Sequence, residues 1–405
     1  MNHRDALAWL FGTQLFGIKL GLENVRRLLI ALGVPAPKQR IVHVAGTNGK
    51  GSVCAMIDAI ARAAGYRTGL FTSPHLVTFR ERIQVNGEMI SETETAEGLS
   101  MIRDLVAEWE PHPTFFEIAT ALGLHHFRAS RCEIIVLETG MGGRLDATNA
   151  ITPVVSALTP IDLDHQKWLG QTLPEIAGEK AGIIKPGVPV VSAEQLPDVR
   201  TILAARAAET GSELIFVSGE PRAEVGLHGA HQRRNAALAV AALRAGKIEV
   251  SDRAVIDGWA GVAWPARFQL WYERLVIDGA HNPAGARALV QTWQETFGHD
   301  KATLILGLFA DKHAAAIYEE LSQIAEAVVL PQFQGQRVMP PAELARIVAS
   351  ITPQMPCTTA TSCAEAVRQS EERPGRILVA GSLHLAGEML AFLRGGPAKF
   401  EACAQ

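Results

Sequence analysis

The sequence predicts an α/β protein with two domains, a larger one on a mostly parallel sheet and a smaller one that follows it. Short apolar runs alternate with longer segments of helical periodicity, as in strands joined by crossover helices. The apolar runs are too hydrophobic to leave one face of a sheet in water, so helices are expected on both faces. The 405 residues exceed what one ordinary core supports.

The first series of elements falls within residues 1–265. An amphipathic helix is expected before Gly33, because leucine and valine recur at helical spacing at Leu22, Val25, Leu28, Leu29 and Leu32. The expected strands are residues 41–45, 134–137, 154–158, 188–192 and 214–217. The expected helices between them are residues 52–64, 173–183, 199–210 and 230–244. This order predicts one larger domain.

A second series occupies residues 266–405, after a stretch without periodicity around Gly261 and Pro265. It consists of strand 275–277, helix 285–297, strand 303–306, helix 313–325, strand 328–330, and strand 377–380 with a closing helix. The alternation predicts a smaller, Rossmann-like α/β domain of its own.

Composition excludes several classes of partner. The formal net charge of −4 gives no general attraction to phosphate backbones, so nucleic acid is not expected as a partner. No apolar run approaches the roughly 20 residues that span a bilayer, and no leader-like segment opens the chain. The five cysteines are odd in number and lack metal-type pairing, as is typical of reduced thiols. We therefore expect a cytoplasmic protein with no membrane partner.

A glycine-rich segment between the first strand and its helix predicts a P-loop-type phosphate site. Glycines let the backbone turn with its amides inward, and a helix N-terminus adds partial positive charge. Lys50 would reach the outer phosphates and Ser52 would offer a hydroxyl to Mg²⁺. The segment is shorter than the strict GxxxxGK[ST] pattern, because Gly51 separates these two residues. Its members are Gly46, Thr47, Asn48, Gly49, Lys50, Gly51 and Ser52.

Polar side chains follow two further strands. Glu138 ends the run 134–137 and precedes a glycine-rich stretch, so at the carboxyl edge of a parallel sheet it is a candidate magnesium ligand. His165 follows the strand 154–158 and could ligate a second ion or orient a phosphate, or simply be hydrogen-bonded within its loop. Lys180 lies in a helix with few charges, where a lysine ordinarily extends to solvent.

Several strings in this order resemble folylpolyglutamate synthase/dihydrofolate synthase, a branch of the Mur ligase superfamily. Nearly the whole chain is covered. The N-terminal strings are residues 46–52, Ser73-Pro74-His75-Leu76, Glu81-Arg82-Ile83, residues 138–149, Asp164-His165 and Glu179-Lys180-Ala181-Gly182-Ile183. The C-terminal ones are Arg267-Phe268-Gln269, Asp278-Gly279-Ala280-His281-Asn282-Pro283 and Gly381-Ser382-Leu383.

The resemblance implies an ATP- and magnesium-dependent amide ligase. A carboxylate of a pterin acid would attack the γ-phosphate of ATP, and the amine of L-glutamate would displace phosphate from the acyl phosphate. Such chemistry depends on positioning and charge neutralisation. The acceptor would be a reduced folate and also dihydropteroate, and the family expectation is a monomer.

The resemblance also implies roles for residues of the first domain. Lys50, Glu138, His165 and Lys180 would be the catalytic set. Ser52 and Glu138 would bind one Mg²⁺, and His165 a second, with Lys180 matching a family lysine that is carbamylated and so supports that metal. The pterin acid would stack on Phe116, with Thr114, Arg144, Asp146 and Ala147 lining its site; packing in the core is the other interpretation of Phe116.

Further roles concern the nucleotide and glutamate. Asn235 would contact adenine or ribose, Arg267 the phosphates and Asp278 the ribose, and His281 and Ser382 are candidates around the glutamate. Three departures from the family pattern affect this side. They are Ala266 where glycine is common, His384 where an aromatic hydroxyl is frequent, and Leu308-Phe309-Ala310 before Asp311-Lys312-His313.

Two other functions compete with this hypothesis. A Mur-type ligase acting on a peptidoglycan precursor is disfavoured by Ser73-Pro74-His75-Leu76 and Glu81-Arg82-Ile83, which resemble the folate branch. A nucleotide-dependent switch that ligates nothing is disfavoured by the motif at residues 278–283, because a switch needs no second substrate site. ATP turnover that requires both glutamate and a pterin acid would separate the switch from the ligase.

Overall fold

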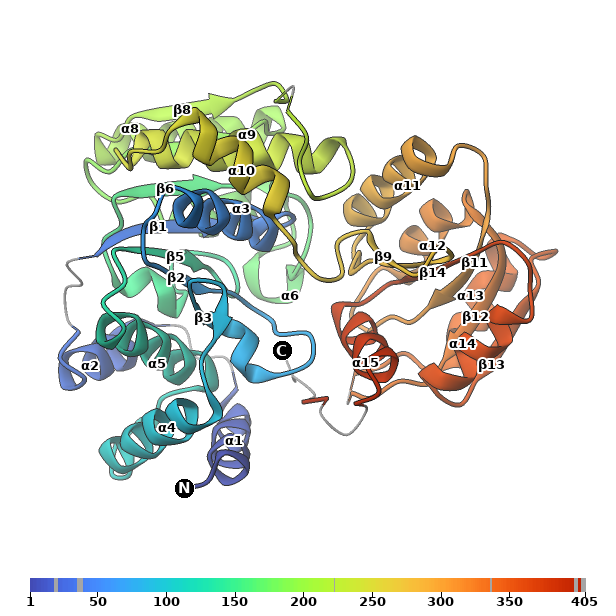
Figure 1. Ribbon diagram of the computed structural model, residues 1–405, viewed down its shortest axis with the longest axis horizontal. Helices are drawn as coiled ribbons and strands as arrows, with labels where there is room; N and C mark the ends of the chain where they lie inside the picture. The colour runs from blue at the N-terminus through green and yellow to red at the C-terminus, as the bar shows by residue number, and fades with distance from the viewer. Residues whose placement is uncertain (18–20, 35–38, 222, 336, 397–399, 402–405) are drawn as a thin grey trace. The chain divides into compact units, whose positions relative to one another are not determined.

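A computed structural model describes residues 1–405 except 18–20, 35–38, 222, 336, 397–399 and 402–405. The described chain forms two compact units (Figure 1). The first comprises Met1–Ser73, Arg80–Gly226 and Gln232–Val262. The second comprises Pro74–Phe79, Leu227–His231 and Ala263–Gln405. The limits 1–265 and 266–405 stay a prediction, and the compact units differ from them by two short exchanged segments and by residues 263–265, which belong to the second unit.

The first unit is built on an eight-stranded sheet in the order β4-β3-β2-β5-β1-β6-β7-β8. All neighbours are parallel except the pairs β2–β3 and β3–β4, which are antiparallel. Its strands are β1 (Arg40–Ala45), β2 (Thr68–Phe71), β3 (Ile83–Val85), β4 (Glu88–Met89), β5 (Ile134–Glu138), β6 (Val155–Leu158), β7 (Val190–Ala193) and β8 (Leu214–Val217). The mostly parallel sheet expected from the apolar runs is therefore confirmed.

Helices cover this sheet. They are α1 (His3–Gly12), α2 (Glu23–Ala31), α3 (Lys50–Ala63), α4 (Glu92–Val106), α5 (Phe115–Ala129), α6 (Gln166–Leu169), α7 (Leu173–Ala181), α8 (Pro197–Thr210), α9 (Ala230–Ala245) and α10 (Asp252–Gly261), with 3₁₀ turns η1 (Thr13–Phe16), η2 (Phe79–Arg82) and η3 (Ala147–Ala150). The α3 helix contacts β1, β2 and β5, and α10 packs against α3. Eleven residues of α3 are buried, so most of this helix lies in the interior of the unit.

The second unit contains a six-stranded sheet in the order β13-β12-β11-β14-β10-β9, parallel except for the edge pair β9–β10. Its elements are β9 (Gln269–Trp271), β10 (Leu275–Ile277), α11 (Pro283–Phe297), β11 (Ala302–Leu306), α12 (Ala314–Ser322), β12 (Ala325–Pro331), α13 (Pro341–Ile351), β13 (Cys357–Ala360), α14 (Cys363–Glu371), β14 (Arg376–Ala380) and α15 (Leu383–Leu393). Separate apolar clusters contain Leu304 and Leu306 on one side and Ile305 on the other, as strand alternation requires.

Several expected boundaries differ from the structure by one to three residues, and two of them illustrate why. The helix expected over 313–325 ends at Ser322, and Ala325 already begins β12. The strand expected from residue 188 begins at Val190. Apolar residues continue helical spacing through Leu321 and Ile324, so periodicity alone placed the helix end too late.

The segment Pro74–Phe79 packs within the second unit although it is distant in sequence. Leu76 and Val77 lie against an apolar cluster of that unit, and a Cβ on Gly387 would overlap the Leu76 carbonyl. The His75 Nε2 atom lies 2.8 Å from the carbonyl oxygen of Glu401, whose carboxylate accepts a 2.6 Å bond from the Phe79 amide. We call this segment the strap.

None of the described helices is long and apolar enough to cross a membrane. Cys54, Cys132, Cys357 and Cys363 are free thiols, and Cys403 lies outside the described residues.

Candidate functional site

The glycine-rich turn connects β1 to α3 in the first unit. Gly46 has a φ of 147° and Gly49 a φ of 88°, values that residues with a Cβ rarely adopt. A Cβ on Gly46 would overlap Thr159 Oγ1, and one on Gly49 would lie 3.0 Å from the amide oxygen of Asn235. The α3 helix begins at Lys50, directly after Gly49. A helix N-terminus that follows such a turn offers free amides to an anion.

Two lysines converge on one carbonyl of this turn. Lys50 Nζ donates to the carbonyl oxygens of Gly46 and Thr47, both at 3.2 Å. Lys180 Nζ donates to the same Gly46 oxygen at 2.8 Å. The Lys50 amine adds positive charge beside the helix N-terminus, which suits a polyanion, and Lys180 reaches the same turn from α7.

The Lys180 side chain is buried, contrary to the ordinary expectation for a lysine on a helix. It is 3% exposed in α7. Burial, and then the charge of Lys50, lower its pKa to about 7, while Asp164 and Asp146 act in the opposite direction. A substantial fraction of this amine is therefore neutral near pH 7.

Glycines bring α7 against the loop that follows β5. A Cβ on Gly143 would lie 2.8 Å from the Glu179 carbonyl oxygen, and one on Gly182 would overlap Arg144. The Arg144 amide donates to that Glu179 oxygen at 2.7 Å, and its guanidinium pairs with the Glu179 carboxylate at 2.8 Å. This close approach places Lys180 beside the turn.

Glu138 and Ser52 lie on neighbouring elements of the same sheet edge. Glu138 ends β5 opposite Val44 of β1, is 4% exposed, and accepts a bond from the Ser73 amide at 3.1 Å. Ser52 in α3 is fully buried, and its hydroxyl has no hydrogen-bond partner within the described part of the chain. A buried hydroxyl without a partner costs about 1–3 kcal/mol, and a bound cation would satisfy it. These oxygen donors fit Mg²⁺.

The loop after β6 is tied to the glycine turn. Thr47 Oγ1 donates to the Asp162 carbonyl at 2.9 Å and accepts from the Asp162 amide at 3.0 Å. His165 follows in the left-handed region, with φ 52° and ψ 33°, and its side chain is 43% exposed. Its Nε2 lies 3.9 Å from an Asp164 carboxylate oxygen. Strained backbone of this kind often occurs at functional sites, but the metal role of His165 stays a prediction.

Across the described ranges, no group of three or more His, Cys, Asp or Glu side chains could hold a metal ion. Mg²⁺ usually binds through one or two carboxylates together with phosphate oxygens and water, and Ser52 and Glu138 near the turn fit such a site.

Residues predicted to line the pterin site come from α5 and from the loop after β5. Thr114 caps α5 through reciprocal bonds with Glu117. Phe116 is half-buried, and a Cβ on Gly140 would lie 2.6 Å from its ring. The buried Asp146 carboxylate accepts bonds from the amides of Gly140 and Met141, both at 2.9 Å. Ala147 is buried at the start of η3, whereas the Arg144 guanidinium is largely exposed.

Asn235 belongs to the first unit. It lies on α9, is 5% exposed, and donates to the Gln232 side chain at 3.0 Å. Its amide group faces Gly49, so the structure places this residue beside the glycine turn.

Four predicted residues lie in the second unit. Asp278 accepts bonds from the amides of Phe268 at 2.7 Å and Ala280 at 2.8 Å, and burial raises its pKa. Arg267 donates to the Ala266 carbonyl at 2.9 Å. His281 Nδ1 lies 2.8 Å from the Gly279 carbonyl. Ser382 is 2% exposed and caps α15 by accepting from the His384 amide at 3.0 Å.

Two contributors to this site are missing from the candidate residues drawn from the sequence. Ser73 holds Glu138 through its backbone amide, which no side-chain pattern reveals. Asp164 acts on the pKa of Lys180 and precedes His165, so its acidic side chain was the available signal.

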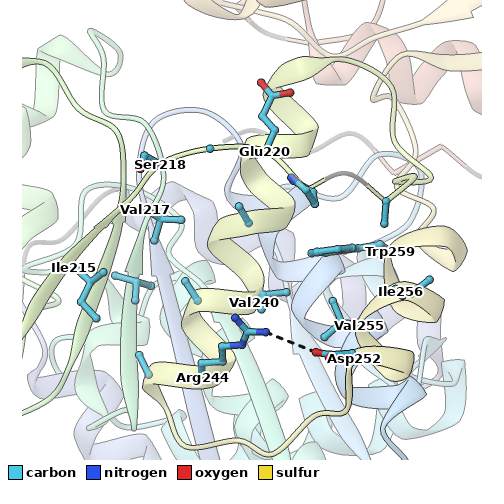
Figure 2. Close-up of a pocket in the computed structure, with 17 residues that line it drawn as sticks. Ile215, Val217, Ser218, Glu220, Val240, Arg244, Asp252, Val255, Ile256 and Trp259 are labelled. Carbon is cyan, nitrogen blue, oxygen red and sulfur yellow. Dashed lines mark ion pairs between the residues drawn. The ribbon is translucent and has the colours of Figure 1, made fainter.

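A separate pocket of about 950 Å³ lies among β8, α9 and α10 (Figure 2). Its walls are mainly apolar, and Arg244 and Asp252 pair across one end at 3.8 Å. None of the predicted site residues lines it. This hollow is thus distinct from the glycine turn.

Family comparisons cover both units. Residues 44–194 match the family described as Mur ligase middle domain. Residues 266–383 match the family described as Mur ligase, glutamate ligase domain. These two ranges contain the glycine turn and the motif at residues 278–283, respectively.

Relatives of known name extend over most of the chain. A dihydrofolate synthase/folylpolyglutamate synthase from Bacillus subtilis is 36% identical over 83% of this chain and 86% of its own length. An Escherichia coli relative, solved in complex with DHPP and ADP, has a TM-score of 0.86 at 30% identity and covers 96% of this chain and 98% of its own.

A third relative carries a metal. The bifunctional folylpolyglutamate synthase/dihydrofolate synthase from Yersinia pestis, complexed with AMPPNP and a Mn ion, has a TM-score of 0.85 at 31% identity and covers 97% of this chain and 98% of its own. With matches of this extent on both units, the chain belongs to the folylpolyglutamate synthase/dihydrofolate synthase family of Mur ligases.

Proposed function

We propose that this chain is an ATP-dependent ligase that joins L-glutamate to reduced folates and to dihydropteroate through an acyl phosphate. Membership of the family supports the reaction class. The observation that carries the proposal is the convergence of Lys50 and Lys180 on the Gly46 carbonyl, directly before the N-terminus of α3. A triphosphate is the natural anion for such a site.

The proposed roles follow the chemistry of each side chain. Lys50 and the turn amides, from Gly46 through Ser52, hold the β- and γ-phosphates and neutralise charge that develops during transfer. Ser52 and Glu138 would hold one Mg²⁺, and His165 with Lys180 a second. The ions, when bound, polarise the γ-phosphate and shield its charge from the attacking carboxylate.

Carbamylation of Lys180 belongs to this proposal. Only a neutral amine attacks carbon dioxide, and the lowered pKa of about 7 makes that form available near neutral pH. The resulting carbamate is an anion, which suits a residue that supports a metal ion. The bond to Gly46 shows that this amine already reaches the turn.

The substrate side completes the proposal. The relative bound to DHPP and ADP supports a pterin-acid site and a nucleotide site in one chain. We assign the pterin acid to Thr114, Phe116, Arg144, Asp146 and Ala147. We assign the nucleotide to Asn235, Arg267 and Asp278, and the glutamate to His281 and Ser382. A cytoplasmic location and a monomeric state are further expectations.

Incorporation of labelled glutamate tests the function directly. Purified enzyme receives ATP, Mg²⁺ and glutamate with either dihydropteroate or tetrahydrofolate. We expect incorporation into both acceptors, loss of it with EDTA, and recovery when Mg²⁺ or Mn²⁺ is restored. Incorporation into neither acceptor under these conditions would contradict the proposal, and ATP hydrolysis without any acceptor would favour the switch instead.

A further inference from the structure

A histidine inside the first sheet is not used by the proposed reaction. His43 lies in the middle of β1, paired with Leu137 of β5 and Ser156 of β6. It is fully buried. A buried imidazole among aliphatic strands is unfavourable unless it is hydrogen-bonded, so its partner identifies what the residue does.

His43 is hydrogen-bonded to the loop that follows β5. Its Nε2 lies 2.8 Å from Thr148 Oγ1. The Thr148 hydroxyl in turn donates to Asp146 Oδ1. Since a hydroxyl has one proton and Asp146 takes it, the Thr148 oxygen must accept from His43. The proton therefore sits on His43 Nε2, and Nδ1 is the unprotonated nitrogen.

The remaining observations agree with this tautomer. His43 Nδ1 has no hydrogen-bond partner among the described residues, which costs less for a bare nitrogen than for an N–H group. Burial, and then the charge of Lys185, lower the pKa of His43 to about 3, so the ring is neutral at physiological pH.

The Asp146 carboxylate is the end of this chain of bonds. It accepts from the Thr148 hydroxyl and amide on Oδ1 and from the amides of Gly140 and Met141 on Oδ2. Four donors use the roughly four lone-pair sites of a carboxylate. Asp146 is thus fully engaged in shaping the loop from residue 139 to η3.

That loop forms the wall against which Phe116 lies. Gly140 contacts the Phe116 ring so closely that no Cβ fits between them. A displacement of Asp146 would release the Gly140 and Met141 amides and move this wall. The effect of His43 on a ligand at Phe116 would be transmitted by Thr148 and Asp146.

We propose that His43 and Thr148 are positioning residues for the pterin-acid site, acting through Asp146 on the Gly140 wall beside Phe116. This inference rests on the proposed function for the identity of the ligand. Asp146, which is assigned to the pterin-acid site, thereby also holds the loop of that site in shape through its carboxylate. Neither His43 nor Thr148 touches the reacting atoms.

Kinetics on four variants test the proposal. Thr148→Val removes the hydroxyl and keeps the shape, whereas Thr148→Ser keeps the hydroxyl. His43→Leu removes the donor, and His43→Gln returns an N–H near the position of Nε2. We expect Thr148→Val and His43→Leu to raise KM for dihydropteroate about tenfold, with KM for ATP within about twofold of wild type. In Thr148→Ser and His43→Gln, by contrast, KM for dihydropteroate should stay close to the wild-type value.

A matched control lies on the neighbouring strand. Ser156 is fully buried on β6 opposite His43, and its hydroxyl donates to the Ile183 carbonyl at 2.9 Å. Ser156→Ala removes a buried hydrogen bond from the same sheet without touching Asp146, so KM for dihydropteroate should stay at the wild-type value. Equal rises in both KM values for Thr148→Val, or no rise at all, would overturn the proposal.

A spectroscopic measurement separates this inference from the proposed function. Long-range ¹H–¹⁵N spectra of histidine-labelled protein report the tautomer of each ring, and His43→Gln identifies the signal. We expect His43 to be neutral with Nε2 protonated between pH 6 and 8. A protonated Nδ1 would contradict the relay even if glutamate is incorporated normally. An enzyme without ligase activity but with this tautomer would instead contradict only the assigned ligand.

Discussion

Lys50 and Lys180 share one carbonyl acceptor, yet their surroundings differ. Lys50 begins α3 and reaches back over the turn, whereas Lys180 comes from α7 and is buried. The position of Lys50 at the turn could be predicted from the sequence, because glycines, a lysine and a hydroxyl follow a strand. The position of Lys180 could not, because a lysine in a helix usually extends to solvent and only the family resemblance indicated otherwise.

Loss of the Lys50 amine should remove charge stabilisation from phosphoryl transfer. We expect Lys50→Ala to lower kcat for glutamate incorporation by about 10²–10³-fold, as for other preorganised donors to a developing anion. Lys167→Ala is the control, because Lys167 is exposed and lies over Trp168 at 5.4 Å. Steady-state kinetics of both variants check this, and equal losses would argue against a specific role for Lys50.

Lys180 should make the free energy of unfolding depend on pH when its amine is not carbamylated, as in buffer free of carbon dioxide. Its pKa is about 7 in the folded protein, against 10.5 for an unperturbed lysine, so the unfolded chain binds more protons between these values. The free energy of unfolding should therefore rise with pH across this interval, by up to about 1.4 kcal/mol per pH unit. Below the folded-state pKa, Lys180 is protonated in both states, so its unfavourable contribution to the free energy of unfolding no longer changes with pH.

Lys180→Met tests this dependence. Urea unfolding at pH 7, 8 and 9 should show a wild-type free energy that rises relative to the variant as pH increases. Parallel pH profiles for the two proteins would mean that the Lys180 amine is not desolvated in the folded state.

At the scale of elements, β1, the glycine turn and α3 could be predicted from the sequence. A short apolar run predicts the strand, the glycines after it predict the turn, and the helical spacing of apolar residues that follows predicts the helix. The strands β3 and β4 were missed because they are short, partly exposed and antiparallel. The small edge strand β9 was missed for a similar reason, since it contains three residues and Leu270 is exposed. Short edge elements carry too little periodicity to be found.

Two glycines of the α7 region provide a matched test of how this helix positions Lys180. A Cβ on Gly182 would overlap Arg144, whereas one on Gly178 would meet nothing within 4 Å. Gly182→Ala should displace α7, lower activity at least tenfold and lower the melting temperature. Gly178→Ala should keep activity and add up to ~1 kcal/mol of stability, because alanine favours a helix interior.

Activity assays and thermal melts of Gly182→Ala and Gly178→Ala test whether the close approach of α7 to the loop positions Lys180. Wild-type activity in Gly182→Ala would show that the close approach of α7 to the loop is not required for Lys180 to function.

For the whole molecule, alternation of strands and helices was sufficient to predict the fold class and two α/β units. It could not predict that the strap belongs to the second unit, because contacts distant in sequence leave no periodic pattern. The partners of Asp146 illustrate the same limit within the site: backbone amides carry its hydrogen bonds, and any residue supplies those.

Nucleotide binding should raise the stability of the protein. At a concentration 100 times its Kd, a ligand that binds only the folded state adds ~2.7 kcal/mol. We expect AMPPNP with Mg²⁺ to raise the melting temperature by about 5–10 °C. Lys50→Ala should lose most of this rise, and Lys167→Ala should keep it. An equal rise without Mg²⁺ would contradict metal-assisted binding.

The strap has a consequence for dividing the gene. A protein fragment that begins near residue 266 would contain the whole second sheet. It would lack Leu76 and Val77, which pack against an apolar cluster of the second unit. The surface at Gly387, against which the Leu76 backbone lies, would then be uncovered, and the tail residue Glu401 would lose its backbone partners. Such a fragment should be prone to aggregate when expressed alone, and adding a peptide that spans residues 74–79 should improve its recovery.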